Sequence, residues 1–245
     1  MNHGVRFVRR GRIAEITLDL RSTADRFTAD AAAAFAEACE RCADDGVWVV
    51  LLRSAGASFC VGTDGADWPP LATLDFVAAL AAVRQPVVAA IRGRAEDEGF
   101  ELALAADLRV VEQRTRFVMT QVGRGRLPVH GGTQRLPRVI GAERALMTIV
   151  LGEPIGARQA IEWGLAQRID RSADRAARTL ADQLAERGPI GMRYAKEAVR
   201  RAADFTLDDG ARFEHDLYVL LETTRDRAEG VAAFLAKRKP IFRGK

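Results

Sequence analysis

The stretch RAEDEGFELALAAD, Arg94 to Asp107, decides how the fold and the chemistry of this chain are to be interpreted. An apolar, strand-like run, PVVAAIRG (Pro86 to Gly93), leads directly into it, and a helix is expected to follow. Acidic residues gather at the start of that helix, where free N–H groups and the helix dipole favour negative charge. Ordinary helix capping would explain these acids, and so would a turn that handles a carbonyl group.

Strands and helices alternate on both sides of this turn. Residues 5–20 predict two short strands joined by RRGR, and Thr28 to Asp45 predicts an amphipathic helix whose first residue is the N-cap. The β-branched run Val47 to Ala55 predicts a strand buried on both faces, and shorter strands are expected at Leu108–Gln113 and Phe117–Met119. This alternation predicts an α/β layered core.

The second half of the chain has a different character. After Gly131 almost every segment has helical periodicity, and Gly188–Pro189 is the natural break within this part. We therefore expect an α/β core over residues 1–187 and a helical region over residues 188–245.

Size and composition are those of an ordinary globular protein. The chain has 245 residues, of which 48% are hydrophobic and 29% are charged, so it can bury one sizeable core. No apolar run approaches the roughly 20 residues of a membrane span. The N-terminal segment MNHGVRFVRRGRIAEI lacks the apolar centre of a signal peptide. We expect a cytoplasmic protein without membrane association.

The charge balance is basic but does not select a partner. The net charge is +4, and only four of the 37 basic residues are lysines. The basic residues are spread along the chain, with one cluster in the C-terminal AKRKPIFRGK. Such a tail suits a phosphate-bearing small molecule as readily as nucleic acid. Because no helix carries a clear comb of arginine or lysine, nucleic-acid binding is not expected.

The three cysteines do not predict a metal or redox site. Cys39 and Cys42 form a C-x-x-C inside a helical pattern, where residues three apart are neighbours on one face. No second pair of ligands accompanies them, so both are expected to be structural. Cys60, in SFCVGTD, is a lone thiol in a loop, and no histidine can be placed beside it as a base.

Five separated motifs resemble, in their order along the chain, those of the crotonase superfamily of enoyl-CoA hydratases and isomerases. They are SFCVGTD, PVVAAIRG with GFELALAADLRV, LPVHGGTQRLPRVIGAERAL, EPIGARQAIEWGLAQRI and GVAAFLAKRKPIF. The resemblance runs from about Ile13 to Phe242 and implies an α/β, crotonase-like spiral of ββα repeats. It also implies a C-terminal helical region that forms a homotrimer or a dimer of trimers. The implied substrate is an acyl-CoA thioester, with no metal or redox cofactor.

The chemistry shared by that family is the stabilisation of a thioester enolate by two main-chain N–H groups. By position, these groups belong to Glu98, at the start of the helix, and to Thr63. Gly62 and Asp64 flank Thr63 and are expected to shape its loop beside the substrate. A helix N-terminus supplies such donors together with a favourable dipole. Glu101 matches a family glutamate that acts as general acid and base, although a first-turn acid that stabilises the dipole would also fit.

Two features depart from the family pattern. Gln121 stands where the second family glutamate is expected, and an amide can hold a water molecule but cannot exchange protons with it. Asp97–Glu98–Gly99 replaces a run of glycines. A carboxylate at Glu98 would oppose a developing negative charge unless it points away or is protonated. Glu98 is therefore open to three interpretations: a new catalytic acid, an outward-facing residue, or a sign that turnover was lost.

Four further residues are assigned to substrate binding by position. Cys60 lies in the loop of Thr63, and His130 precedes a helix where the family has a small residue. A titratable imidazole there could compensate for the missing glutamate, although a capping or solvent-facing histidine is commoner. Phe234 and Lys237 match residues that cover the adenine and contact the phosphates of coenzyme A, from a neighbouring subunit in the family.

These residues favour an enoyl-CoA hydratase-like lyase in which Glu101 transfers protons and activates water. Isomerisation, thioester hydrolysis or decarboxylation on the same scaffold are the alternatives, and a degenerate coenzyme A-binding homologue is a further one. The segment between Asp64 and Pro86, with Trp68–Pro69–Pro70, is short for the family and indicates an altered acyl pocket.

Overall fold

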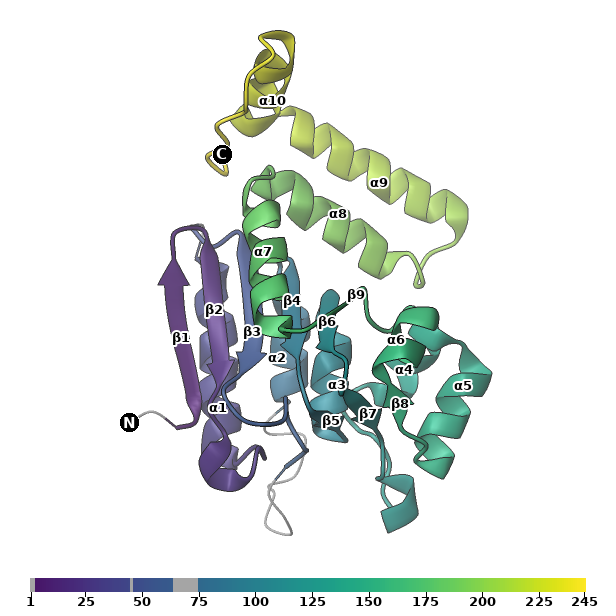
Figure 1. The fold of residues 1–245 in the computed structure, drawn as a ribbon. Helices are drawn as coiled ribbons and strands as arrows, with labels where there is room; N and C mark the ends of the chain where they lie inside the picture. The colour runs from purple at the N-terminus through teal and green to yellow at the C-terminus, as the bar shows by residue number, and fades with distance from the viewer. Residues whose placement is uncertain (1–2, 45, 64–74) are drawn as a thin grey trace.

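The computed structural model describes residues 3–44, 46–63 and 75–245. Asp64 and Trp68–Pro69–Pro70 lie outside the described residues, so the expectations for them stay predictions. The predicted α/β core is present, with a sheet between two layers of helices (Figure 1).

Six strands make up the main sheet, and these are β1 (Val5–Arg10), β2 (Ile13–Leu18), β3 (Val49–Ser54), β4 (Val87–Ile91), β6 (Leu108–Glu112) and β9 (Arg168–Asp170). They lie side by side in that order, with β1 antiparallel to β2 and every other pair parallel. The carboxyl ends of parallel strands meet at one edge of a sheet, which is where loops assemble binding sites. The loops after β3 and β4 meet at this edge, and they carry Thr63 and Glu98.

The sheet is covered on both faces, as the apolar run at residues 47–55 predicted. Helices α1 (Ala29–Glu40), α2 (Phe76–Ala82) and α3 (Glu98–Ala105) cover one face, and α7 (Ala173–Ala185) covers the other (Figure 1). Alternate residues of β3 face the two layers, so that Leu52 joins the first core and Leu51 the second. The predicted N-cap is confirmed, since Thr28 accepts a hydrogen bond from the Ala31 N–H group.

The region after Gly131 is less uniformly helical than its sequence pattern predicted. It contains α4 (Gly132–Ile140), α5 (Ala142–Leu146), a π-helical turn (Met147–Leu151) and α6 (Ala157–Glu162), but also strand β9 of the main sheet. A second, small sheet joins β5 (Arg94–Glu96), β7 (Arg116–Val118) and β8 (Ile155–Gly156). The prediction was wrong for β8 and β9 because strands of two or three residues are too short to show a period.

The C-terminal helices α8 (Pro189–Arg201), α9 (Leu207–Glu222) and α10 (Arg225–Leu235) extend from one end of the core (Figure 1). Pro189 is the first residue of α8, a position that suits its missing N–H group. Large apolar side chains remain exposed here, and Phe234 is 82% exposed. Among the described residues, none of the helices combines the length and the apolarity needed to cross a bilayer.

Candidate active site

Glu101 lies in the first turn of α3, and its side chain is fully buried. Its Oε1 atom accepts hydrogen bonds from the main-chain N–H groups of His130 and Gly132, both at 2.8 Å. Its Oε2 atom has no hydrogen-bond partner among the described residues. One half of the carboxyl group is thus anchored by the loop before α4, and the other half is available to a proton or a ligand.

Burial raises the pKa of Glu101 from its ordinary value of 4.5 to about 7, because a surrounding of low polarity disfavours the charged form. The hydrogen bonds from Gly132 and His130 lower this pKa, and the nearby charge of Glu98 raises it. A carboxyl group that titrates near neutral pH can both accept and donate a proton there. This property favours proton transfer over simple stabilisation of the helix dipole.

Gln121 is also buried, and neither its amide oxygen nor its amide nitrogen has a partner among the described residues. Its main chain is well held, because its carbonyl oxygen accepts hydrogen bonds from the N–H groups of Arg124 at 3.0 Å and Arg126 at 2.9 Å. The side chain can therefore offer one donor and one acceptor to a water molecule or a substrate oxygen, but no acid.

Asp97 holds the start of α3 in a strained conformation. Its φ angle is 48° and its ψ angle −115°, in a region that glycine favours and other residues rarely adopt. Its carboxylate accepts a hydrogen bond from the Thr120 N–H group at 2.6 Å and forms an ion pair with Arg124. These contacts connect the start of α3 to the residues on both sides of Gln121, and they hold Asp97 in its unusual conformation.

The Glu98 side chain is only 3% exposed, so the outward-facing alternative is wrong. Its Oε1 atom lies 3.3 Å from Nη2 of Arg126. Both acids are thus paired with an arginine from one segment, Asp97 with Arg124 and Glu98 with Arg126. Sequence reasoning did not predict these pairs; the run GRGR at 123–126, so close after Gln121, is the signal that could have indicated them.

The loop of Thr63 lies directly against the start of α3. A Cβ atom built on Gly62, whose φ angle is +94°, would lie 2.9 Å from Oε2 of Glu98. One built on Gly99 would lie 2.2 Å from the carbonyl oxygen of Cys60, so only glycine allows the two main chains to come this close. Phe27 fixes the loop from the other side, because its N–H group donates to the Gly62 carbonyl at 2.9 Å.

Cys60 is fully buried within this contact and is no nucleophile in the usual sense. Burial raises the pKa of its thiol to about 12, whereas a reactive cysteine needs a lowered one. Its Sγ atom lies 3.6 Å from the Gly62 carbonyl oxygen. Its assignment to substrate binding stays a prediction. Cys39 and Cys42 are free and buried, as expected of structural residues.

His130 is buried as well, which makes the solvent-facing alternative wrong. Its Nδ1 atom lies 3.0 Å from Oδ1 of Asp75, the N-cap residue of α2. Its Nε2 atom has no partner among the described residues. Sequence reasoning did not identify Asp75, whose position before the helical run FVAALAA indicates no more than a cap.

Two predicted site residues lie elsewhere in the chain. Phe234 lies near the end of α10 and Lys237 two residues beyond that helix, at the opposite end of the molecule from α3 (Figure 1). Within one chain the structure does not bring them to Glu101. Among the described residues, no group of three or more histidine, cysteine or acidic side chains could hold a metal ion.

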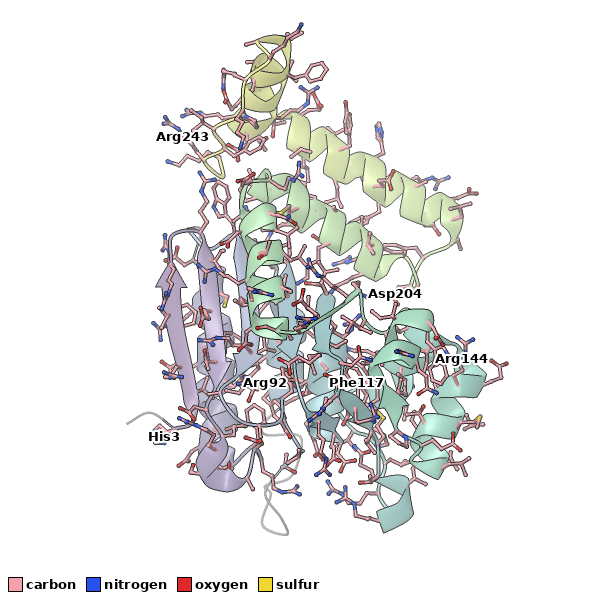
Figure 2. All side chains as sticks on the ribbon, in the orientation of Figure 1. His3, Arg92, Phe117, Arg144, Asp204 and Arg243 are labelled. Carbon is pink, nitrogen blue, oxygen red and sulfur yellow. The ribbon has the colours of Figure 1, made fainter. Side chains whose placement is uncertain are left out.

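Unpartnered polar atoms concentrate in this site. Within residues 3–44, 46–63 and 75–245, five buried polar side-chain atoms lack a hydrogen-bond partner, and four of them belong to Glu101, Gln121 and His130. The fifth is Nε of Arg92, the residue that directly follows β4 (Figure 2). Because a buried polar group without a partner costs free energy, these atoms are candidates for hydrogen bonds to a water molecule or a ligand.

Comparison with known proteins gives one consistent result. A 1,2-epoxyphenylacetyl-CoA isomerase of Escherichia coli is 36% identical over 218 residues, which cover 82% of this chain and 83% of that protein. An (E)-benzylidenesuccinyl-CoA hydratase of Thauera aromatica is 36% identical over 82% of this chain and 83% of its own. The crystal structure of an enoyl-CoA hydratase from Mycobacterium tuberculosis superposes with a TM-score of 0.93 at 29% identity, covering 99% of this chain and 100% of that one.

The family model described as enoyl-CoA hydratase/isomerase matches residues 9–245, nearly the whole chain. Five motifs, the sheet with its two helical layers, and relatives that align over most of their own length point the same way. The chain therefore belongs to the enoyl-CoA hydratase/isomerase family, the crotonase superfamily, and is an enzyme that acts on acyl-CoA thioesters.

Proposed function

We propose that this enzyme is an enoyl-CoA hydratase-like lyase, which adds water across the double bond of a 2-enoyl-CoA thioester. The observation that carries the proposal is the buried carboxyl group of Glu101, which has a pKa of about 7 and, among the described residues, an Oε2 atom without a hydrogen-bond partner. Hydration needs one group that takes a proton from water and others that hold the water in place.

The thioester carbonyl is assigned to the N–H groups of Thr63 and Glu98. Neither group donates a hydrogen bond to another described residue, and the close approach of Gly62 to Glu98 brings their two segments into contact. Glu98 is the first residue of α3, so the helix dipole adds to the attraction for a negative oxygen. The pairing of the Glu98 carboxylate with Arg126 reduces its repulsion of the enolate.

In the proposed reaction Glu101 removes a proton from water, and the water oxygen forms a bond to C3. The electron pair of the double bond moves onto the thioester as an enolate, which the two N–H groups stabilise. A proton then joins C2, so that the elements of one water molecule have been added. The Gln121 amide oxygen accepts a hydrogen bond from the water molecule, or its NH2 group donates one to it, and the side chain supplies no proton.

The proposal includes the assembly and the cofactor. Phe234 is too exposed to be packed within its own chain, and Lys237 lies close by, which suits contact with the adenine and phosphates of a coenzyme A bound to a neighbouring subunit. The proposed assembly is a homotrimer or a dimer of trimers in the cytoplasm. Coenzyme A enters as part of the substrate, without a separate cofactor.

The test is to incubate the purified protein with a panel of short, long and aromatic 2-enoyl-CoA thioesters. Hydration abolishes the ultraviolet absorbance of the conjugated double bond and adds the mass of one water molecule to the product. An unchanged mass with a displaced double bond would replace the proposal with isomerisation, and release of the free thiol of coenzyme A would replace it with hydrolysis. Binding of coenzyme A without any turnover would indicate a degenerate homologue.

A further inference from the structure

The contact between Asp75 and His130 has no place in the proposed chemistry so far. The imidazole ring packs against Phe76, with ring centroids 5.3 Å apart, and its Nδ1 atom meets the Asp75 carboxylate at 3.0 Å. That carboxylate also accepts the Ala78 N–H group at 2.8 Å, so its position is fixed by the start of α2. A carboxylate that accepts from Nδ1 leaves Nε2 as the functional atom of the ring, and this buried atom has no partner in the described part of the chain.

This pair is joined to Glu101 through the main chain. The N–H group of His130 is one of the two that hold Oε1 of Glu101, at 2.8 Å. The Arg135 guanidinium binds the His130 carbonyl oxygen, which fixes the same residue from its other end. The main chain of His130 therefore contacts the Glu101 carboxyl group directly.

In the proposed hydration one proton passes from water to Glu101 and one proton joins C2. Glu101 alone can carry the same proton from water to C2, whereas a second acid–base residue allows one group to deprotonate water while the other protonates C2. Gln121 stands where the second carboxyl group would be and cannot donate a proton. His130 is the only histidine among the described residues that is buried in this site.

We infer that His130 is the second acid–base residue of this enzyme and that Asp75 is its positioning residue. In this scheme the protonated ring donates its Nε2 proton to C2 of the enolate, forming the C2–H bond. His130 is then neutral and Glu101 protonated, and the proton returns from Oε2 of Glu101 to Nε2 through a water molecule. The cycle closes without another reactant, and Asp75 supplies the counter-charge for the imidazolium.

Three charged groups are in contact with His130. Asp75 is the N-cap residue of α2, Glu101 lies on α3, and Arg135 lies on α4. The inference rests on the proposed hydration, because the proton it accounts for is the one that joins C2. Hydration by the wild-type enzyme is therefore measured first.

The test replaces His130 with asparagine (His130→Asn), whose amide nitrogen can still donate to Asp75 while the Nε2 function is lost. We expect kcat to fall about 100-fold with KM nearly unchanged, the size of a general acid's contribution. The alkaline limb of the kcat/KM–pH profile should also disappear, and the acid limb due to Glu101 should remain. His215→Asn, at an exposed position on α9, is the matched control and should leave both quantities unchanged.

A second variant, Asp75→Asn, keeps the acceptor for His130 and for the Ala78 N–H group but removes the charge. A reduction of kcat by about tenfold with an altered alkaline limb supports the positioning role.

Exchange of the C2 hydrogen of a saturated acyl-CoA in deuterated water is the independent measurement, and it should slow in His130→Asn. If hydration occurs but both variants keep the wild-type kcat, pH profile and exchange rate, the inference is overturned and the proposed function stands. If the wild type exchanges the C2 hydrogen through His130 but hydrates no substrate, the proposed function fails while the proton-donor role holds. Absence of both hydration and exchange in the wild type overturns both.

Discussion

Two helices of this enzyme carry a buried acid in their first turn, and the two acids have different hydrogen-bond partners. In α10, Asp226 is 5% exposed, and its two oxygens accept the N–H groups of Arg243 and Gly244, both at 2.7 Å. These residues belong to the C-terminal segment that folds back onto the helix, where Figure 2 labels Arg243. In α3, Oε1 of Glu101 accepts hydrogen bonds from two donors, and Oε2 accepts none from the residues that the structure describes.

This difference in hydrogen bonding distinguishes an acid with a structural role from an acid that can transfer a proton. Every oxygen of Asp226 is occupied by the protein itself, so its carboxylate fastens two segments together. Glu101 is positioned by one oxygen and keeps the other free, at the cost of a buried atom without a partner. Within Arg94–Asp107 the same contrast separates Asp97 from Glu101. The Asp97 carboxylate is bound by Thr120 and Arg124, so its role is structural.

Replacing Glu101 with glutamine (Glu101→Gln) should have the largest effect on activity. The amide oxygen can keep the hydrogen bonds from His130 and Gly132, but the proton carrier is lost. We expect turnover of 2-enoyl-CoA thioesters to fall about a thousand-fold, with the fold retained by circular dichroism. Turnover at the wild-type rate would reject Glu101 as the acid–base residue.

The same substitution should change how stability depends on pH. Glu101 has a pKa of about 7 in the folded chain and about 4.5 when unfolded, so the folded state favours its protonated form. The free energy of unfolding therefore loses about 3 kcal/mol as the pH rises from 4.5 through 7, relative to lower pH. Denaturant titrations of the wild type and Glu101→Gln across this range should diverge accordingly. Parallel curves would mean that the carboxyl group is not desolvated.

Gly99→Ala should loosen the site by separating its two loops. The new Cβ atom would lie 2.2 Å from the Cys60 carbonyl oxygen and 2.7 Å from its carbon, which is main chain and cannot rotate away. We expect the free energy of unfolding to fall by about 2–3 kcal/mol, and kcat/KM to fall as the start of α3 moves away from Thr63.

Gly230→Ala is the matched control for that prediction. On α10 the new methyl group would lie 3.7 Å from the Phe242 ring, an ordinary contact. Alanine is the better helix former, so stability should stay equal or rise by up to about 1 kcal/mol. Equal destabilisation by both substitutions would show that the Gly99 contact is not special.

Asp226→Asn should affect stability and leave the chemistry largely intact. One of its two hydrogen bonds to the C-terminal segment loses its acceptor, and the charge that strengthens both is removed. We expect a loss of about 2 kcal/mol in the free energy of unfolding, with turnover of the folded protein reduced less than threefold. A loss of turnover like that of Glu101→Gln would end the contrast between the two acids.

The sequence predicted the parts of this molecule that depend on local pattern. The helix capped by Thr28, the buried strand after Val47 and the helix at Glu101 follow from capping, β-branched runs and apolar spacing. The order of five motifs also indicated the family, which the comparisons confirm.

Features that depend on contacts between distant segments could not be predicted in this way. The pairs Asp97–Arg124 and Glu98–Arg126 join residues 27 and 28 positions apart, and Asp75 and His130 are separated by 55. Local spacing carries no information about such partners, which depend on how the loops meet at the sheet edge. For the same reason the burial of Glu98 was not foreseen.

The most direct measurement is a crystal structure of the enzyme with a saturated acyl-CoA, which keeps the thioester carbonyl and cannot be hydrated. The carbonyl oxygen should lie about 2.7–3.1 Å from the main-chain nitrogens of both Thr63 and Glu98, with its C2 atom facing Glu101. A carbonyl oxygen bound by neither nitrogen, with the thioester held elsewhere, would contradict the account.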